Sequence, residues 1–146
     1  MEHGVTLTEM VQKMNLKNLT PNVELVGKEV NIPDVNRPAL QLAGFFEHFD
    51  SDRVQIIGYV EYTYLQTLTE ERKTEIYEKM LKRKVPCVVF SRSLPPEESF
   101  LRIAQERDVP VFSTQKKTSS FMSELIRWLN VMLAPCISIH GVLLYV

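Results

Sequence analysis

The sequence predicts an α/β domain in which a parallel or mixed β-sheet is flanked by helices. Short β-branched runs alternate with helical patterns along the chain. One stretch, residues 85–112, places strand, helix and strand in the order of a right-handed βαβ crossover. The 146 residues are the length of one domain, and 45% of them are apolar. A chain of this size and composition forms a core without disulfides or a structural metal.

The amino-terminal part is expected to begin with a helix and continue into a strand. Thr6 and Glu9 have the spacing of a capping box, and apolar residues repeat behind them at helical intervals. Residues 23–30 are predicted to form a strand interrupted by one glycine. A short apolar helix follows, with Asn36 as its expected N-cap.

The middle of the chain is predicted to contain a turn at residues 50–52, a buried strand at 54–58 and helical sequence at 62–84. Thr69 is the expected N-cap of a second helical segment. Four apolar residues share one face of this segment: Ile76, Tyr77, Met80 and Leu81. The opposite face carries charges of both signs, which is typical of a helix side that faces solvent.

Residues 85–112 give the clearest supersecondary pattern. Residues 85–90 are expected to form a strand, a helix begins near 95–98 where two prolines precede two glutamates, and residues 109–112 form a second, parallel strand. A last amphipathic helix is predicted after this unit, with Thr118 or Ser119 as its cap.

No Asp, Glu, Lys or Arg occurs between Trp128 and Val146. A membrane-spanning segment is one interpretation of such a stretch. Its polar and helix-breaking residues disfavour that interpretation, because they would need hydrogen-bond partners inside lipid. We therefore expect the last helix to end, Pro135 to break it, and one buried strand to run to the final residue.

Composition excludes several classes of function. The formal net charge of −1 provides no basic excess for a nucleic acid. The five glycines are too widely separated to form a GxxxxGK or GxGxxG phosphate-binding loop, which excludes a self-contained nucleotide-binding enzyme of either kind. The two cysteines suit neither a disulfide framework nor a zinc site, and no signal peptide opens the sequence. A cytoplasmic protein is therefore expected.

Two loops at the predicted carboxyl edge of the sheet are candidates for binding an anion. Both join the end of a strand to the start of a helix, and both contain hydroxyl groups and cations suited to a phosphate or carboxylate. The candidate residues are Ser91, Arg92 and Ser93 in the first loop and Thr114, Lys116, Lys117 and Thr118 in the second. The other interpretation is that they are ordinary turn and cap residues with solvated cations.

His140 and the segment 47–52 are two further candidates. His140 interrupts an apolar stretch, so it is either a hydrogen-bonded core histidine or a catalytic group. The segment 47–52 gathers oxygen and nitrogen ligands, but no second ligand set stands at a recognised metal spacing. We expect a polar turn there and no metal site.

Four segments resemble one protein family in their order and spacing. They are RPALQLAGFFEHF (37–49), RVQIIGYVEYTYLQTL (53–68), PCVVFSRSLPPEE (86–98) and LAPCISIHGVLLYV (133–146). Together they resemble the N-terminal domain of bacterial HPr kinase/phosphorylase. The resemblance implies that residues 1–134 are the regulatory or assembly domain and that residues 135–146 are the first strand of a kinase domain.

This resemblance implies that the whole protein phosphorylates and dephosphorylates a serine of HPr, the phosphocarrier of the sugar phosphotransferase system. It would thereby control carbon catabolite repression. The family resemblance further implies ATP and Mg²⁺ as cofactors, a hexamer, and a bacterial cytoplasmic location. The family's catalytic histidine corresponds to His140, but its phosphate-binding loop would follow Val146. The present sequence alone is thus expected to be non-catalytic and to bind neither cofactor.

Two other functions stay open at this point. The chain could be a stand-alone module that binds an anion or a nucleotide sugar through the loops at Ser91 and Thr114, since the family's N-terminal domain resembles the nucleotide-sugar-binding domain of the Mur ligases. A free-standing enzyme using His140 is the third possibility, although no catalytic partner of that histidine is visible in the sequence.

Overall fold

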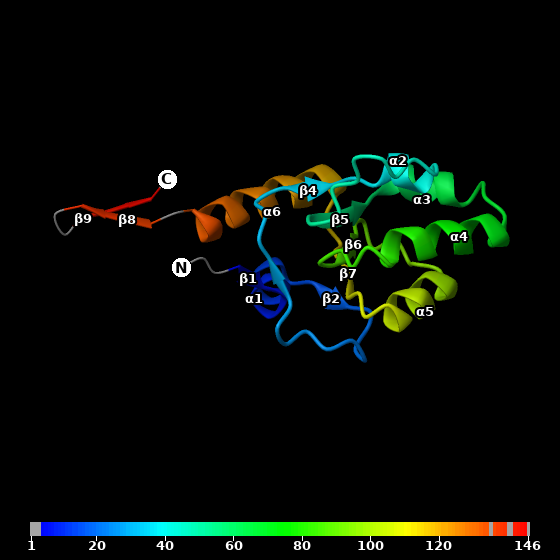
Figure 1. Cartoon of the computed structure of the whole chain (residues 1–146), viewed down its shortest axis with the longest axis horizontal. Helices are drawn as coiled ribbons and strands as arrows, with labels where there is room; N and C mark the ends of the chain where they lie inside the picture. Colours follow the sequence, from blue (N-terminus) through cyan, green and yellow to red (C-terminus); the bar gives the residue numbers. More distant parts are fainter. Residues whose placement is uncertain (1–3, 135, 140–141, 146) are drawn as a thin grey trace.

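The computed structural model describes residues 4–134, 136–139 and 142–145 (Figure 1). Nine strands and six helices are assigned in this part of the chain. The strands are β1 (Val5–Thr6), β2 (Lys17–Asn18), β3 (Glu29–Val30), β4 (Val35–Asn36), β5 (Val54–Ile57), β6 (Val88–Phe90), β7 (Val111–Ser113), β8 (Cys136–Ile139) and β9 (Val142–Tyr145). The helices are α1 (Leu7–Met14), α2 (Ala39–Leu42), α3 (Tyr59–Leu65), α4 (Glu70–Leu81), α5 (Glu98–Glu106) and α6 (Thr118–Leu133).

The centre of the domain is a mixed five-stranded sheet with the order β2-β7-β6-β5-β4. Strands β4, β5, β6 and β7 run parallel to one another, and the register of β6 and β7 pairs Val88 with Val111. The edge strand β2 is antiparallel to β7, which places Lys17 opposite Ser113. The predictions of an α/β fold and of a parallel βαβ unit at residues 85–112 are confirmed.

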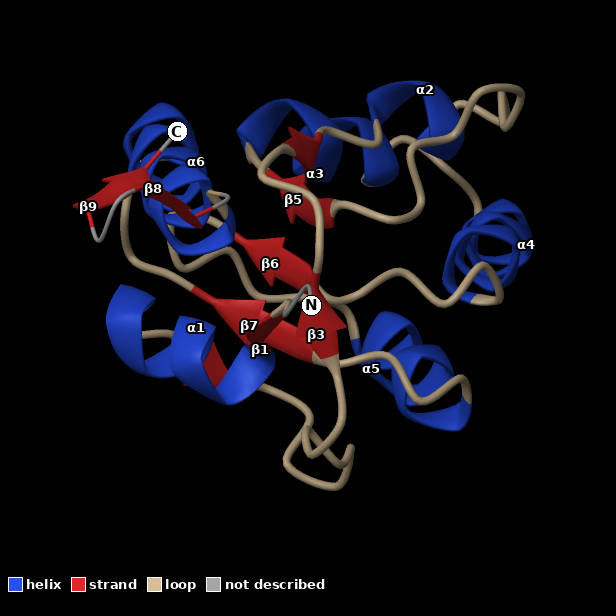
Figure 2. Cartoon of the chain, turned by 60° about the vertical axis from the view of Figure 1, so that its left-hand side comes forward, coloured by secondary structure: helices blue, strands red, loops and turns tan. Residues whose placement is uncertain are grey.

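The sheet lies between two layers of helices (Figure 2). Helices α1 and α6 cover one face, where Val54 and Ile56 of β5 join one buried apolar cluster. Helices α2 to α5 cover the other face, where the next residue, Ile57, joins a second buried cluster. This alternation follows from the strand geometry, because successive side chains point to opposite faces of a sheet.

Two predicted helix starts are confirmed at their caps. The Thr6 hydroxyl accepts a hydrogen bond from the Glu9 amide at 3.1 Å, and the Glu9 carboxylate accepts one from the Thr6 amide at 3.1 Å. This reciprocal capping box begins α1. Thr69 caps α4 by accepting a hydrogen bond from the amide of Arg72. The region predicted as helical at 62–84 thus divides into α3 and α4.

The strand predicted at 23–30 is mostly wrong. Only β3 is extended, and it pairs with β1 rather than with the central sheet. Two turns replace the rest, with Val23 N donating to the Thr20 carbonyl and Lys28 N to the Leu25 carbonyl. Gly27 has a φ of +82°, a left-handed conformation that a regular strand does not contain.

The N-caps predicted for α2 and α6 are wrong. Asn36 lies in β4, and its side-chain amide donates to the Gln55 carbonyl oxygen at 2.7 Å, so it supplies no cap to α2. Thr118 is the first residue of α6 rather than its cap, and Ser119 follows it inside the helix. The Asn36 side chain forms its hydrogen bond with Gln55 instead, and the Thr118 hydroxyl forms one with Ser91.

The single strand expected at the carboxyl terminus is a hairpin. Strands β8 and β9 pair antiparallel with each other and form a sheet separate from the central one. In Figure 1 this hairpin lies beyond the C-terminal end of α6. Pro135, His140 and Gly141 lie outside the described residues, so the predicted break and the histidine's environment stay predictions.

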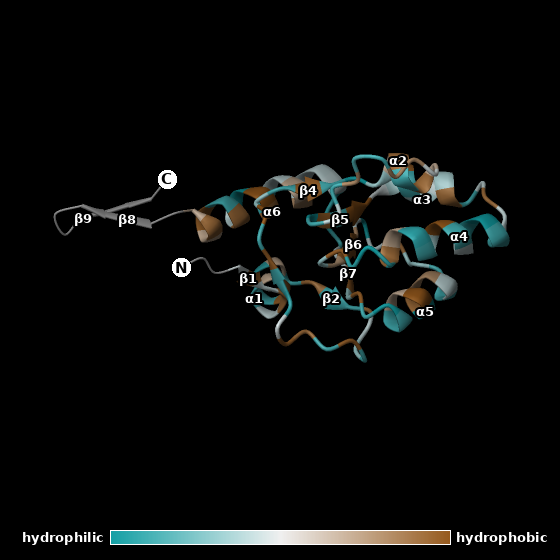
Figure 3. Cartoon of the chain, in the orientation of Figure 1, coloured by the Kyte–Doolittle hydropathy of each residue, from teal (hydrophilic) through white to brown (hydrophobic). Residues whose placement is uncertain are grey.

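Helix α4 shows how far the charge pattern predicts exposure. Its apolar face is buried as expected, and its charged residues give the teal colour along its other side in Figure 3. Lys73 is an exception, because it is buried despite belonging to the charged face. No helix in the described part of the chain combines the length and the hydrophobicity needed to cross a bilayer.

Candidate functional site

The chain changes sides of the sheet between two neighbouring strands. After β6 it continues into α5 on one face, and after β7 it continues into α6 on the opposite face. The two connecting loops, residues 91–97 and 114–117, therefore diverge at the carboxyl ends of adjacent parallel strands. In open α/β sheets this point of reversal is where ligand crevices form.

The two loops are tied together by their own backbones. Arg92 N donates to the Lys116 carbonyl at 2.9 Å, and Ser93 N donates to the Thr114 carbonyl at 2.8 Å. Arg92 and Ser93 both have positive φ values, 56° and 54°, which lie in the left-handed region of the backbone. Arg92 and Ser93 were predicted to bind an anion, but the carbonyls of the second loop already accept hydrogen bonds from their backbone amides.

Ser91 and Thr118 join the bases of the same two loops. Both are buried, and their hydroxyl oxygens lie 2.6 Å apart. Gly58 packs against this pair so closely that a β-carbon at its position would lie 2.6 Å from the Thr118 hydroxyl oxygen. Ser91 and Thr118 therefore hold the start of α6 against the sheet, and neither hydroxyl is exposed to a ligand.

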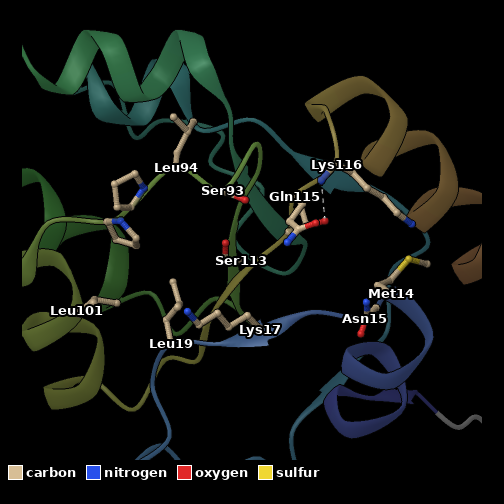
Figure 4. Close-up of a pocket in the computed structure, with 13 residues that line it drawn as sticks. Met14, Asn15, Lys17, Leu19, Ser93, Leu94, Leu101, Ser113, Gln115 and Lys116 are labelled. Carbon is tan, nitrogen blue, oxygen red and sulfur yellow. Dashed lines mark hydrogen bonds between the residues drawn. The ribbon is translucent and has the colours of Figure 1, made fainter.

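A groove with a volume of about 560 Å³ opens beside these loops (Figure 4). Three of the predicted anion-site residues line it: Ser93, Thr114 and Lys116. Two others, Arg92 and Lys117, are exposed but do not line it. The remaining lining residues are Met14, Asn15, Lys17, Leu19, Leu94, Pro95, Pro96, Leu101, Ser113 and Gln115.

No pattern in the sequence indicates the residues on the amino-terminal side of the groove. Lys17 and Leu19 belong to β2 and the segment after it, almost a hundred residues before the strand they join. They reach the groove because β2 adds to the sheet edge next to β7. Such a pairing of a two-residue strand has no periodic pattern by which it could be found.

The charged residues that line the groove are both cationic. Lys17 and Lys116 line the groove, and neither Asp nor Glu does. The ammonium of Lys116 forms an ion pair with Glu124 of α6. Within the described residues no carboxylate lies within 4 Å of the Lys17 ammonium. Lys17 is therefore the cation whose charge the neighbouring residues leave uncompensated.

A buried ion pair lies near the start of α3. The Glu61 carboxylate accepts from Arg37 Nε at 2.9 Å and from Arg37 Nη2 at 2.6 Å, and it also accepts from the Gly58 amide at 2.8 Å. Only 3% of the Glu61 side chain is exposed. This ion pair holds the connection between β4 and α2 against α3, so we assign it a structural role.

A second polar cluster links α4 to the start of α5. Lys73 Nζ donates to Glu97 Oε2 at 2.9 Å, and the Tyr77 hydroxyl donates to Glu97 Oε1 at 2.8 Å. Burial raises the pKa of Glu97, but the two hydrogen bonds and the Lys73 charge outweigh burial and lower it overall. The hydrogen bond to Glu97 raises the pKa of Lys73. The cluster is therefore held in its charged form.

The other candidates from the sequence gain no support as sites. His140 lies outside the described residues. Residues 47–52 form a surface segment, and no group of three or more His, Cys, Asp or Glu side chains that could hold a metal occurs in the described part of the chain. Cys87 is fully buried, and burial raises the pKa of its thiol, so it is an unreactive core residue.

Comparison with known proteins decides the family. The sequence matches the family described as HPr Serine kinase N terminus over residues 5–129, which is most of the chain. The chain belongs to this family. The matched range contains the central sheet, the groove of Figure 4 and all six helices except the last turn of α6.

Curated relatives of this family cover nearly the whole chain. The HPr kinase/phosphorylase of Lachnoclostridium phytofermentans is 54% identical over 141 residues, which are 97% of this chain and 46% of that protein. Proteins of the same name from Caldicellulosiruptor bescii and Streptococcus thermophilus are 39% and 34% identical, covering 97% and 95% of this chain and 45% of each relative. The chain thus spans slightly less than half the length of these relatives.

A solved structure supports the fold of this HPr kinase N-terminal family member. The crystal structure of the CBS and DRTGG domains of the regulatory region of Clostridium perfringens pyrophosphatase matches with a TM-score of 0.52. The match covers 84% of this chain and 46% of that one, at 15% sequence identity. At this identity the likeness concerns the α/β fold alone.

Proposed function

We propose that this chain is the amino-terminal regulatory or assembly part of a bacterial HPr kinase/phosphorylase and has no phosphoryl-transfer activity of its own. The observation that carries the proposal is the 54% identity to a protein of that name, of which the chain corresponds to 46%. The activity, HPr as substrate, the hexamer and the cytoplasmic location belong to the whole protein in this proposal.

The chemistry of the chain supports a non-catalytic role. Phosphoryl transfer from ATP needs backbone amides, a lysine and Mg²⁺ around the transferred phosphate. The glycines of this sequence cannot form the usual loop for that purpose. We assign ATP and Mg²⁺ binding to the rest of the whole protein, and His140 to the catalytic set only when that part is present.

The test is a phosphorylation assay with two proteins. The chain is incubated with HPr, ATP and Mg²⁺, and phosphoserine is measured by mass spectrometry, with the Lachnoclostridium phytofermentans enzyme as the positive control. We expect phosphoserine from the control alone. Turnover by the chain itself would refute the non-catalytic assignment.

A chimera tests the positive part of the proposal. Residues 1–134 of this chain replace the corresponding residues of the Lachnoclostridium phytofermentans enzyme, so that only the amino-terminal part changes. We expect the chimera to phosphorylate HPr and to have the same assembly size as the parent by light scattering. A chimera that is folded by circular dichroism but is inactive and of a different assembly size would contradict the proposal.

A further inference from the structure

The groove of Figure 4 lies at the kind of place where open α/β sheets form ligand crevices. It adjoins the carboxyl ends of β6 and β7, at the point where the chain changes sides of the sheet. The hydrogen bonds from Arg92 N and Ser93 N fix the two loops that form its wall. The groove is therefore preformed, which lowers the entropy cost of binding.

The lining combines one cation, hydroxyl groups and an apolar surface. Lys17 and Ser113 are register partners on adjacent antiparallel strands, so their side chains are neighbours on one face of the sheet. In Figure 4 the Ser93 and Ser113 hydroxyls lie between Leu94 on one side and Leu19 on the other. A hydroxyl pair beside a lysine without a carboxylate partner suits anionic oxygens.

The apolar side of the groove is an extension of the core. Leu19, Leu94 and Leu101 are partly buried and pack against the cluster beneath α4 and α5, while leaving surface at the groove. Pro95 and Pro96 continue this surface. The volume of about 560 Å³ is within the range of small-molecule sites, which is roughly 300–1,000 Å³.

We propose that this groove binds a small organic anion, with a phosphate or carboxylate next to Lys17, Ser93 and Ser113 and an apolar or ring-shaped part against the leucines. The ligand would give the regulatory domain a signal to respond to. Binding of this anion goes beyond the proposed function and does not depend on the identity of the whole protein, whereas the ligand's role as a signal rests on the proposed function.

The test is an NMR titration of the ¹⁵N-labelled chain with four probes. Phenyl phosphate carries both parts of the expected ligand, benzoate replaces the phosphate by a carboxylate, and inorganic phosphate and phenol each carry one part. We expect saturable shifts at the amides of Leu19, Ser93 and Ser113 with phenyl phosphate or benzoate, and weaker binding of the two partial probes. The better of the first two identifies the anionic group.

A pair of matched lysine variants tests the mechanism. Lys17→Gln removes the cation from an exposed position and should raise the dissociation constant of the preferred probe about fivefold, the loss of one exposed charge-assisted contact. Lys82→Gln removes an exposed lysine that does not line the groove and should leave the constant unchanged.

Three results would overturn the inference. Phenyl phosphate and benzoate could leave the groove amides unshifted at millimolar concentration, shift only amides elsewhere, or bind Lys17→Gln as tightly as the original chain. None of these results bears on HPr phosphorylation by the chimera, so a failure here is distinguishable from a failure of the proposed function.

Discussion

The buried pair between Arg37 and Glu61 allows a quantitative prediction. In Glu61→Gln the side chain keeps its shape, but one carboxylate oxygen becomes an amide nitrogen that faces a guanidinium N–H or the Gly58 amide. Three hydrogen bonds of 2.6 to 2.9 Å end on this carboxylate. Removing one partner of a buried ion pair costs about 3–5 kcal/mol. Because 32% of the Arg37 side chain is exposed and can be hydrated, we expect the lower end, about 3 kcal/mol.

Urea unfolding followed by circular dichroism measures this difference. With a slope of about 2 kcal/mol per molar, the midpoint should fall by about 1.5 M. The matched control is Glu78→Gln, which breaks an Arg–Glu pair with Arg107 at 2.8 Å whose side chains are 38% and 43% exposed. Exposed pairs contribute about 0–1 kcal/mol. Equal losses in the two variants would show that burial does not determine the cost of the Glu61 change.

Three further outcomes are expected. Gly58→Ala should lower the free energy of unfolding by about 2 kcal/mol in urea titrations, because its β-carbon would lie 2.6 Å from the Thr118 hydroxyl oxygen; an unchanged midpoint would show that α6 shifts freely. Lowering the pH below 4.5 should destabilise the protein, since the pKa of Glu97 is lower in the folded state than in the unfolded one. Lys73→Met should reduce the loss of stability between neutral pH and pH 4. Identical pH profiles for this variant and the original chain would contradict the role of Lys73 in lowering the pKa of Glu97. Alkylation of Cys87, followed by peptide mass spectrometry, should require unfolding of the chain.

Local signals in the sequence predicted most of the helices and inner strands. The capping residues Thr6 and Thr69 make hydrogen bonds within three residues of themselves, so the sequence contains both partners. The predictions of the buried strand β5 and of the parallel unit of β6, α5 and β7 depend on the spacing of apolar residues, which is also local in the sequence. Their predictions were accordingly confirmed, with boundaries shifted by one to three residues.

Predictions failed where a distant partner competes with a local pattern. Asn36 has the chemistry of a cap, but its side-chain amide donates to Gln55 of the neighbouring strand. The Thr118 hydroxyl likewise forms a hydrogen bond with the Ser91 hydroxyl in the loop after β6. Lys73 follows the charged pattern of an exposed helix face, yet Glu97 holds it in a buried position. In each case a side-chain hydrogen bond between distant segments replaced the expected solvent or cap contact.

The candidate site shows the same division. The sequence correctly placed two polar loops at the carboxyl ends of adjacent strands, because the βαβ pattern dictates that arrangement. It did not indicate that amides of the first loop donate to carbonyls of the second, or that Lys17 and Leu19 complete the groove. These features depend on backbone dihedral angles and on the pairing of an edge strand.

The sequence by itself determined the family, the α/β class and the lack of a glycine-rich phosphate loop, since these depend on residue identity, order and spacing. Only the tertiary structure decided which polar groups are exposed to a ligand. Of seven residues proposed for an anion, it buries Ser91 and Thr118 away from the groove, leaves Arg92 and Lys117 outside the groove, and places Ser93, Lys116 and the buried Thr114 in its lining. The physical reason is that a polar group's availability is set by its spatial neighbours, and folding brings those neighbours from distant parts of the chain.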